Sequence, residues 1–172
     1  MWSLETKNLY IRELTKDDFD DYFALCHQPD IHPYVSHISH DKEVEYARFI
    51  SYIQMVYGFY GFGLWGIYLK ENDTLIGQAG IESQLVEDTG EITLSYFVDP
   101  DHQRHGYGFE ACRAILDYSA DELEFNRITA IISPENIPSR RLAEKLGFHF
   151  EKMTFYQNTE SCLYVRNTAI SD

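Results

Sequence analysis

Apolar and polar positions alternate along this chain in two different periods, and the changes between them divide it into expected strands and helices. Alternation with period two, bounded by turn residues, predicts seven strands. These are Leu9–Leu14, Phe62–Leu69, Thr74–Glu82, Glu91–Val98, Arg127–Ile132, Phe148–Tyr156 and Ser161–Arg166. A polar turn at Lys70–Asp73 is expected to join the second and third of them as a hairpin.

Apolar residues spaced three and four apart predict four helices between these strands. They run from Thr15 to about Gln28, from about Asp41 to Tyr57, from Tyr107 to Leu123 and from Pro138 to Lys145. Thr15 is the expected N-cap of the first helix, and Gly58 is expected to end the second. The order of strands and helices predicts an α/β layered domain with a mixed sheet and helices on both faces.

At 172 residues the chain is long enough for one sizeable core, and no linker rich in Pro, Gly or Ser divides it. We expect one domain over residues 1–168, followed by a short tail at 169–172. The apolar runs are too short to span a membrane, and the stretch Met1–Lys7 lacks the regions of a secretory signal. The expected location is therefore the cytoplasm, with no membrane partner.

Acidic residues outnumber basic ones by 28 to 14, which gives a net charge of −14. Such a charge disfavours binding to nucleic acid, which needs a basic face, and favours the approach of a cationic molecule. The basic residues are unevenly spread, because seven of the fourteen fall between residues 104 and 152. We expect that segment to hold any phosphate groups that the protein binds.

The stretch Gln103-Arg104-His105-Gly106-Tyr107-Gly108 follows a predicted strand and opens a predicted helix. Its two glycines let backbone N–H groups converge on one point, and the helix N-terminus adds a partial positive charge. These features predict a cradle for the pyrophosphate of an anionic cofactor. A dinucleotide-binding loop would follow the first strand, and the phosphate loop of an NTPase needs Gly-Lys-Ser or Gly-Lys-Thr, so neither explains this motif.

Six stretches of the chain, taken in order, resemble one protein family. They are Leu4–Leu14, Phe62–Lys70, Leu75–Gly77, Glu91–Tyr96, Gly106–Ala111 and Asn136–Phe148. Together they resemble the GCN5-related N-acetyltransferases (GNAT), and most closely the branch of the ribosomal-protein N-terminal acetyltransferases. The resemblance implies a single-domain GNAT fold, with a mixed, mostly antiparallel sheet of about six to seven strands and helices on both faces. It also implies acetyl-CoA as the acyl donor and an amine as the acceptor, either a peptide N-terminus or a small molecule.

The same resemblance implies which residues contact the cofactor. Main-chain groups near Phe97 and Val98 would pair with the pantetheine arm, and the Asn-x-x-Ser corner at Asn136 and Ser139 would meet the pantetheine and the sulfur. Asn and Ser are also ordinary helix-capping residues. Arg140 or Arg141 would meet the ribose phosphate or stay in solvent. The expected cofactor contacts are Phe97, Val98, Arg104, His105, Gly106, Tyr107, Gly108, Phe109, Asn136, Ser139 and Arg141.

The chemistry of acetyl transfer requires an uncharged amine, an environment that stabilises an oxyanion and a proton for the departing thiolate. Many GNAT proteins supply that proton from a tyrosine, but the matching position here is Ala143. Ser139 is therefore the candidate acid or sulfur contact. Glu91 is the candidate base, acting directly or through water; the alternative is a surface carboxylate at a strand end. A weak base suits an α-amine better than a lysine amine, because the α-amine loses its proton more easily.

The acceptor pocket is expected to be shaped by Ile31–His40 and the second helix. The histidines His32, His37 and His40 lie in an irregular loop without a second ligand cluster at motif spacing, which argues against a metal site. A series of aromatic residues is expected to pack in the core rather than line an acceptor cleft. It comprises Tyr52, Tyr57, Phe59, Tyr60, Phe62 and Trp65.

The three cysteines, Cys26, Cys112 and Cys162, are too far apart in sequence to suggest a disulfide framework or a zinc pattern, and we expect them to be buried. None is expected to be a nucleophile, because direct attack of an amine on a thioester needs none. A second function stays open: a CoA-binding regulatory or interaction module that has lost catalysis, as Ala143 suggests. A homodimer is compatible with the aromatic content.

Overall fold

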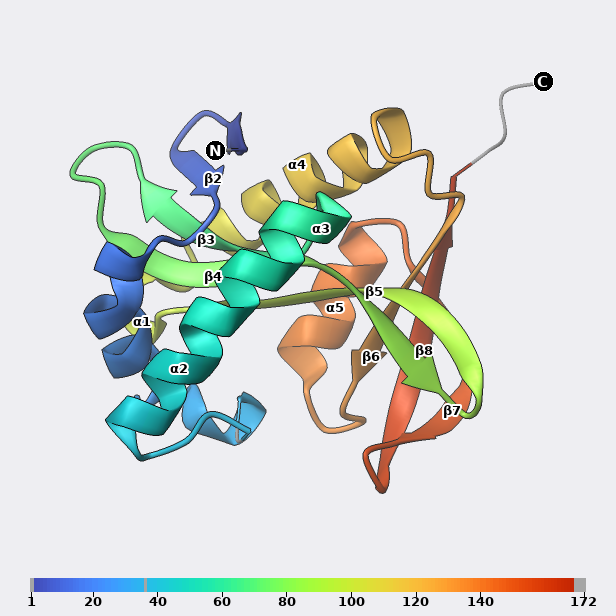
Figure 1. The fold of residues 1–172 in the computed structure, drawn as a ribbon. Helices are drawn as coiled ribbons and strands as arrows, with labels where there is room; N and C mark the ends of the chain where they lie inside the picture. The colour runs from blue at the N-terminus through green and yellow to red at the C-terminus, as the bar shows by residue number, and fades with distance from the viewer. Residues whose placement is uncertain (1, 36, 169–172) are drawn as a thin grey trace. The chain divides into compact units, whose positions relative to one another are not determined.

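The computed structural model describes residues 2–35 and 37–168 and contains an eight-stranded mixed sheet (Figure 1). Its strands are β1 (Ser3–Glu5), β2 (Leu9–Arg12), β3 (Leu64–Leu69), β4 (Leu75–Val86), β5 (Thr89–Val98), β6 (Arg127–Ile132), β7 (His149–Tyr156) and β8 (Thr159–Asn167). The strand order is β1-β2-β3-β4-β5-β6-β8-β7, and β5 pairs with β6 in parallel. The predicted α/β fold is confirmed, with one strand more than expected. The predicted tail at 169–172 lies outside the described residues, and the domain boundary at 168 stays a prediction.

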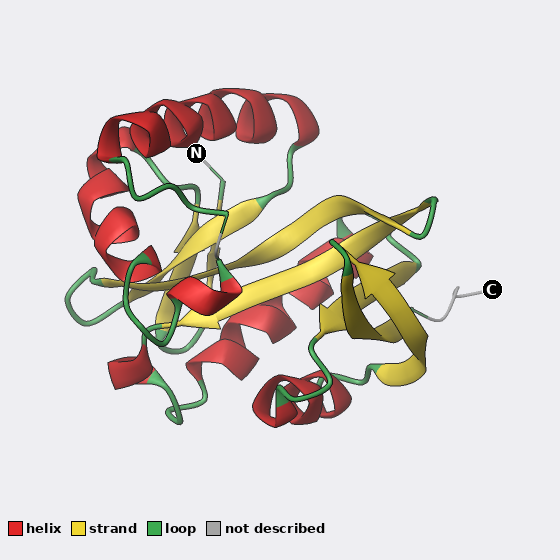
Figure 2. Cartoon of the chain, turned by 90° about the horizontal axis from the view of Figure 1, so that it is seen from below, coloured by secondary structure: helices red, strands yellow, loops and turns green. Residues whose placement is uncertain are grey.

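The helices follow the predicted order (Figure 2). The α-helices are α1 (Phe19–Cys26), α2 (Lys42–Tyr52), α3 (Gly58–Tyr60), α4 (Tyr107–Asp121) and α5 (Ile137–Lys145), with 3₁₀ turns η1 (Lys16–Asp18), η2 (His32–Tyr34) and η4 (Pro100–His102). The predicted cap at Thr15 is confirmed, because its side chain and that of Asp18 form a reciprocal capping box before η1.

The predicted end of the second helix at Gly58 is wrong. A π-helical turn, η3 (Ile53–Tyr57), follows α2 and leads directly into α3. Gly58 takes ordinary right-handed helical angles, whereas Gly61 has a φ of 71° and ends the helix. Both residues are glycine, so composition does not distinguish them. The left-handed conformation at a C-cap selects Gly61 as the end.

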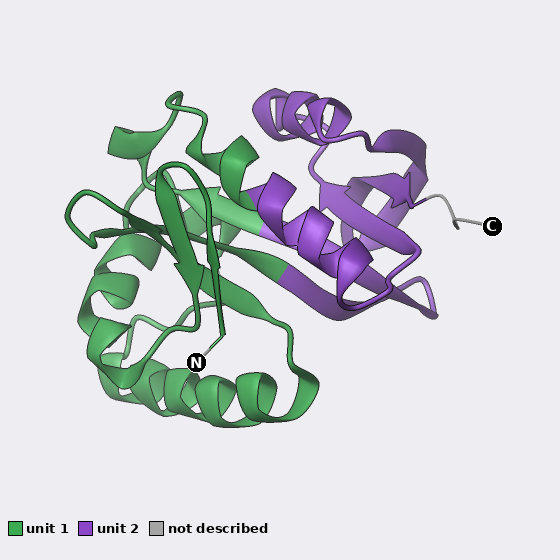
Figure 3. Ribbon diagram, turned by 90° about the horizontal axis from the view of Figure 1, so that it is seen from above, with its two compact units in different colours: residues 1–80, 96–111 green, residues 81–95, 112–172 purple. Residues whose placement is uncertain are grey.

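The chain divides into two compact units (Figure 3). Unit 1 comprises residues 1–80 and 96–111, and unit 2 comprises residues 81–95 together with the chain from 112 onward. The first contains β1, β2 and β3, the first half of β4, the end of β5 and the start of α4. The second contains the rest of β4, β5 and α4 together with β6, α5, β7 and β8.

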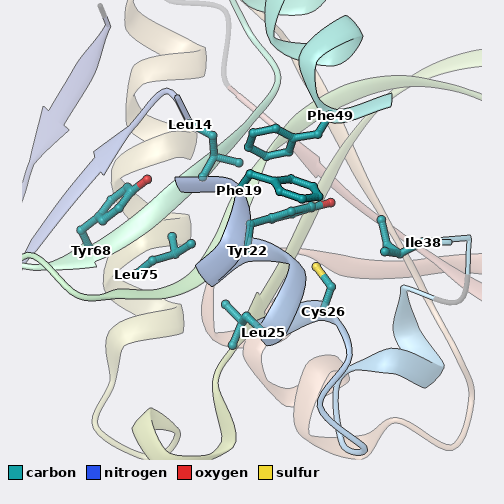
Figure 4. Packing of buried hydrophobic residues seen from close by; sticks show 9 residues of the cluster. All are labelled: Leu14, Phe19, Tyr22, Leu25, Cys26, Ile38, Phe49, Tyr68 and Leu75. Atoms are coloured by element: carbon teal, nitrogen blue, oxygen red, sulfur yellow. The ribbon is translucent and has the colours of Figure 1, made fainter. Parts of the chain in front are cut away.

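The core of unit 1 packs α1 and α2 against β3 and β4 (Figure 4). Phe49 of α2 lies with its ring centroid 5.3 Å from that of Phe19 and 4.9 Å from that of Tyr22, both on α1. Tyr68 of β3 and Leu75 of β4 belong to the same cluster and are also buried. Each fully buried side chain of this size contributes about 1.5–3 kcal/mol, so this aromatic cluster holds both helices onto the sheet.

Two tyrosines from the helical segment bind the start of β3. The amide of Leu64 donates to the hydroxyl of Tyr52 over 2.7 Å, and the hydroxyl of Tyr57 donates to the carbonyl of Leu64. The aromatic series therefore divides into two groups. Tyr52 and Tyr57 serve packing, as does the buried Trp65, whereas Phe59 and Tyr60 on α3 are exposed.

Unit 2 is built on the antiparallel strands β6, β8 and β7. The register between β7 and β8 shifts between Phe150 and Lys152, which marks a β-bulge at Glu151. Two hairpin turns, at Glu87 with Asp88 and at Gln157 with Asn158, have positive φ at both central residues. That geometry matches the right-handed twist of the flanking strands, and it lets β4 continue into β5 and β7 into β8 with two-residue turns.

Candidate active site

The predicted cradle forms a compact turn between β5 and α4, within unit 1. After η4 the backbone enters the left-handed region twice, at Arg104 with φ 63° and at Gly106 with φ 84°. The carbonyl of Gly106 accepts from the amide of Glu110 over 2.9 Å, which makes Gly106 the N-cap of α4. The first amides of a helix have no acceptor within it and lie at the positive end of the helix dipole. Tyr107 and Gly108 therefore stand where an anion would bind.

Hydrogen bonds hold this turn in place. The amide of Asp99 donates to the carbonyl of Ile76 over 2.7 Å, and the side chain of Gln103 donates to the carbonyl of Val98 over 2.9 Å. The imidazole of His102 lies 2.7 Å from a carboxylate oxygen of Asp99. The loop is thus fixed to the ends of β4 and β5, and its shape does not depend on a ligand.

The two glycines leave the front of the turn open. A Cβ added to Gly106 would meet no atom within 4 Å, and one added to Gly108 would make only ordinary contacts, with the nearest atom of Tyr96 at 3.5 Å. The packing of the protein therefore does not require glycine at residue 108. An absent side chain at both positions gives a phosphate close access to the backbone, so the residues present fit a bound pyrophosphate.

The first turn of α4 is anchored by Glu110. One of its carboxylate oxygens accepts from the hydroxyl of Thr6 over 2.6 Å and from the amide of Asn8 over 2.7 Å, and the other accepts from the Asn8 side chain over 2.8 Å. Partial burial raises the pKa of Glu110, but these hydrogen bonds outweigh it and hold the pKa below its ordinary value of 4.5. The carboxylate is thus committed to the β1–β2 turn.

The predicted Asn-x-x-Ser corner lies in unit 2 at the start of α5. The side-chain oxygen of Asn136 accepts from the amide of Ser139 over 3.2 Å, so Asn136 is the N-cap of α5. Both residues are half-buried. The capping role that the sequence allowed is confirmed, and the predicted contact with pantetheine stays a prediction.

The two neighbouring arginines of α5 differ in their surroundings. Arg140 donates to the hydroxyl of Tyr164 and to the carbonyl of Pro134, each over 3.1 Å, whereas Arg141 is exposed. Of the two candidates for the ribose phosphate, Arg141 is the one placed at the surface. Ala143 is buried against the end of the same helix, so the position that often carries a tyrosine contributes only a methyl group to the packing of α5.

The candidate base Glu91 is buried on β5 in unit 2 and is bound to Arg127 of β6. Its two carboxylate oxygens accept from Arg127 over 3.0 and 3.1 Å, and the bulged Glu151 binds the same guanidinium over 2.9 and 3.1 Å. The hydrogen bonds that Arg127 donates to Glu151 and Glu91 raise the pKa of Arg127. The expected alternative of a surface carboxylate is wrong, because the side chain of Glu91 is only 9% exposed. Its role as the base stays a prediction.

The cysteines meet the expectation. Cys26, Cys112 and Cys162 are buried free thiols. Complete burial raises the pKa of Cys112, so this thiol does not supply the thiolate that a nucleophile needs.

Comparison with known proteins agrees with this geometry. The model of the acetyltransferase (GNAT) domain family matches residues 8–149. The chain belongs to the GNAT family. The GNAT chain is 30% identical to YkkB of Bacillus subtilis over 167 residues, which are 96% of this chain and 95% of that protein. It is also 30% identical over 154 residues, 88% of this chain, to the uncharacterized N-acetyltransferase p20 of Bacillus licheniformis, 84% of which is covered.

A solved structure gives the same result for the fold. The acetyltransferase of Agrobacterium tumefaciens superposes on this GNAT chain with a TM-score of 0.80 and 25% identity, covering 98% of this chain and 95% of that one. Among the described residues, no helix combines the length and the hydrophobicity that a membrane span needs.

Several residues support the GNAT site in roles that the sequence does not reveal. Gln103 and Glu110 position the cradle, and Tyr164 positions Arg140. Their contacts join positions that are far apart in sequence or depend on one turn conformation, so spacing carries no signal for them. The predicted site residues fall into two groups. Residues 97, 98 and 104–109 belong to unit 1, and Glu91, Asn136, Ser139 and Arg141 belong to unit 2.

Proposed function

We propose that this protein catalyses the transfer of an acetyl group from acetyl-CoA to an amine. The observation that carries the proposal is the turn at Gly106–Gly108, which presents the open N-terminus of α4 to an anion in a chain of the GNAT family. The acceptor is an α-amine of a peptide or a small-molecule amine, attacked in the cytoplasm. The Asn136–Ser139 corner and Ala143 support a relationship of this protein to the ribosomal-protein N-terminal acetyltransferases.

In this proposal the thioester of acetyl-CoA supplies the activated acetyl group. The amides at the start of α4 bind the pyrophosphate, and backbone groups at Phe97 and Val98 align the pantetheine arm. The acceptor nitrogen attacks the thioester carbon, and the carbon–sulfur bond then breaks. The hydroxyl of Ser139 gives a proton to the departing sulfur, while Glu91, directly or through water, takes the proton that the amine loses.

The chemistry favours an α-amine as the acceptor. An α-amine has a pKa near 8, about two units below that of a lysine amine, so making it neutral costs about 2.7 kcal/mol less. Both proposed proton-transfer groups are weak: Ser139 is a hydroxyl, and both oxygens of Glu91 are bound to Arg127. A substrate that is already partly neutral at physiological pH needs the least help from them.

A CoA-binding module without catalysis is the second candidate function. Two observations favour it: Ala143 replaces the usual acid, and Glu91 is engaged by Arg127. Both candidates require cofactor binding. Release of free thiol from acetyl-CoA, measured with peptide and small-amine acceptors, separates them.

Calorimetric titration with acetyl-CoA tests the cradle, with two matched variants beside the wild-type protein. Gly106→Val and Gly61→Val both place a β-branched residue at a positive φ, 84° and 71°, where no atom lies within 4 Å of the new Cβ. Backbone strain of about 1–2 kcal/mol is therefore common to both. We expect micromolar binding in the wild type and in Gly61→Val, and its loss in Gly106→Val. Equal binding in all three proteins would contradict the cradle.

A further inference from the structure

Three histidines from separate pieces of unit 1 come together beside α1. His27 is the C-cap of α1, His32 begins η2, and His40 precedes α2. Their ring centroids are 4.7–5.5 Å apart, and each ring offers one nitrogen such that the three nitrogens lie within 4.8 Å of one another. Two of these histidines precede Pro33 in the sequence and one follows it, yet their ring nitrogens lie close together.

The hydrogen bonding of His27 fixes which of its nitrogens is available. Its Nδ1 lies 2.8 Å from the carbonyl oxygen of Phe23. A carbonyl can only accept, so Nδ1 is the donor, and in the neutral imidazole that binds metals Nε2 carries the lone pair. The ring of Phe23 lies against that of His27, with centroids 4.2 Å apart, and holds it in this orientation. A backbone carbonyl that binds one imidazole nitrogen while the other faces a ligand is the usual support of a metal-binding histidine.

The available nitrogens lack other partners. Within the described residues, Nε2 of His27 and Nε2 of His32 are buried and have no hydrogen-bond partner. Buried polar atoms are rarely left in this state without a reason, and a bound ion is one of the recognised explanations. Ring stacking accounts for the packing of the imidazoles, but it gives these two nitrogens no hydrogen-bond partner.

We propose that His27, His32 and His40 bind a divalent transition-metal ion, with Zn²⁺ as the first candidate. Neutral imidazoles suit Zn²⁺, Ni²⁺ and Cu²⁺ and disfavour Mg²⁺ and Ca²⁺, which take oxygen ligands. Three histidines leave a fourth position for water, and His40 is exposed, which gives the ion a path from solvent. Tetrahedral bonds of about 2.1 Å place ligand nitrogens about 3.4 Å apart, so binding draws the rings together from their present spacing.

The sequence predicts no metal site for His32, His37 and His40, because they lie in one irregular segment. The structure replaces His37, which is exposed, with His27 from the end of α1. A bound ion would join the end of α1 to the residue before the cap of α2, across the segment that we expect to shape the acceptor pocket. The site does not depend on acetyl transfer.

Tag-free, chelator-stripped protein titrated with ZnCl₂ alone tests the proposal, with a chromophoric chelator as competitor. We expect one tightly bound equivalent. The variants H27A, H32A and H40A should each weaken binding at least tenfold, whereas the matched control H37A, from the same segment, should bind as the wild type does. Circular dichroism of each variant confirms its fold, and H40A, whose side chain is exposed, is the variant least able to disturb it.

A second measurement needs no variant. Cobalt(II) bound to three imidazoles and a water is tetrahedral and gives strong visible absorption, whereas cobalt bound by surface carboxylates is octahedral and gives weak absorption. We expect the strong spectrum, and we expect one equivalent of zinc to abolish it. Absence of saturable zinc binding, equal binding by the three variants and the control, or only the weak cobalt spectrum would each overturn the proposal.

Discussion

At the scale of single residues, the candidate site combines groups that are fixed with groups that are accessible. Asn136 caps α5, and Arg140 is held by Tyr164, so the corner at the start of α5 is rigid. Ser139 and Arg141 lie on that rigid turn, half-buried and exposed respectively. A catalytic side chain must be held rigidly if it is to contact a reacting atom in one fixed geometry.

Replacing Ser139 by Ala tests its role as the acid. We expect kcat to fall about 10- to 100-fold, at or below the usual range for general acids because a serine hydroxyl is a poor one. The KM for acetyl-CoA should change little. Asn136→Ala is the control for the helix start, since it removes the cap at a cost of about 1 kcal/mol in unfolding free energy but leaves the hydroxyl. A normal kcat in Ser139→Ala would remove this residue from the chemistry.

Replacing Glu91 by Gln separates catalysis from structure. As the base, Glu91 should contribute to the chemical step, and Glu91→Gln should lower kcat/KM about 100-fold or more. The variant also weakens the pair with Arg127, which we expect to cost about 1–3 kcal/mol in unfolding free energy because the arginine is 38% exposed and keeps Glu151. A lower melting temperature with an unchanged kcat/KM would assign Glu91 to structure alone.

At the scale of elements, periodicity and turn residues predicted most helices and strands. Each of these elements buries one face, so its apolar residues recur at a regular spacing. The strand β1 has only three residues and exists through its pairing with β2, so its own pattern is too short to indicate it. Gly58 and Gly61 show the same limit, since only φ separates them. The turn before α4 could be predicted because its two glycines lie two residues apart in one short motif, whereas Glu110 and His27 act through residues that local spacing does not reveal.

The anchor at Glu110 predicts a pH dependence. Its pKa is lowered in the folded protein, so its contribution to stability is present above about 4.5 and is lost as the pH falls through the lower, folded value. We expect Glu110→Gln to lower the unfolding free energy by about 1 kcal/mol at neutral pH, a modest figure because the site is partly exposed. Urea unfolding of both proteins between about pH 7 and pH 3 should show the difference shrinking toward acid. A constant difference would contradict the lowered pKa.

At the scale of the whole molecule, the charge is strongly negative, while half of the basic residues lie between positions 104 and 152. A surface of one sign raises the local concentration of oppositely charged molecules, and salt screens this effect. Positions 104–152 are also the segment proposed to bind the cofactor. An acidic protein with this distribution would attract a cationic acceptor without repelling the anionic cofactor from its proposed site.

Two acceptor peptides with the same N-terminal residue, one with a lysine-rich tail and one with a glutamate-rich tail, test this attraction. We expect kcat/KM to be several-fold higher for the cationic peptide at low ionic strength. The advantage should decline as the salt rises toward about 0.5 M, because the Debye length then falls below 10 Å. A preference for the anionic peptide, or one that salt leaves unchanged, would show that local contacts and not the overall charge select the acceptor.

The π-helical turn between α2 and α3 has a consequence for the stability of β3. Residues five apart diverge by about 140° around an α-helix, but the wider turn brings Tyr52 and Tyr57 to the same side, where both reach Leu64. The two phenols take the donor and the acceptor of Leu64, the first residue of β3, beyond the point where the pairing of β3 with β2 ends at Gly66 and Arg12. Deleting one residue from Ile53–Tyr57 would restore a regular helix and remove both hydrogen bonds to Leu64, so we expect a one-residue deletion to lower the free energy of unfolding.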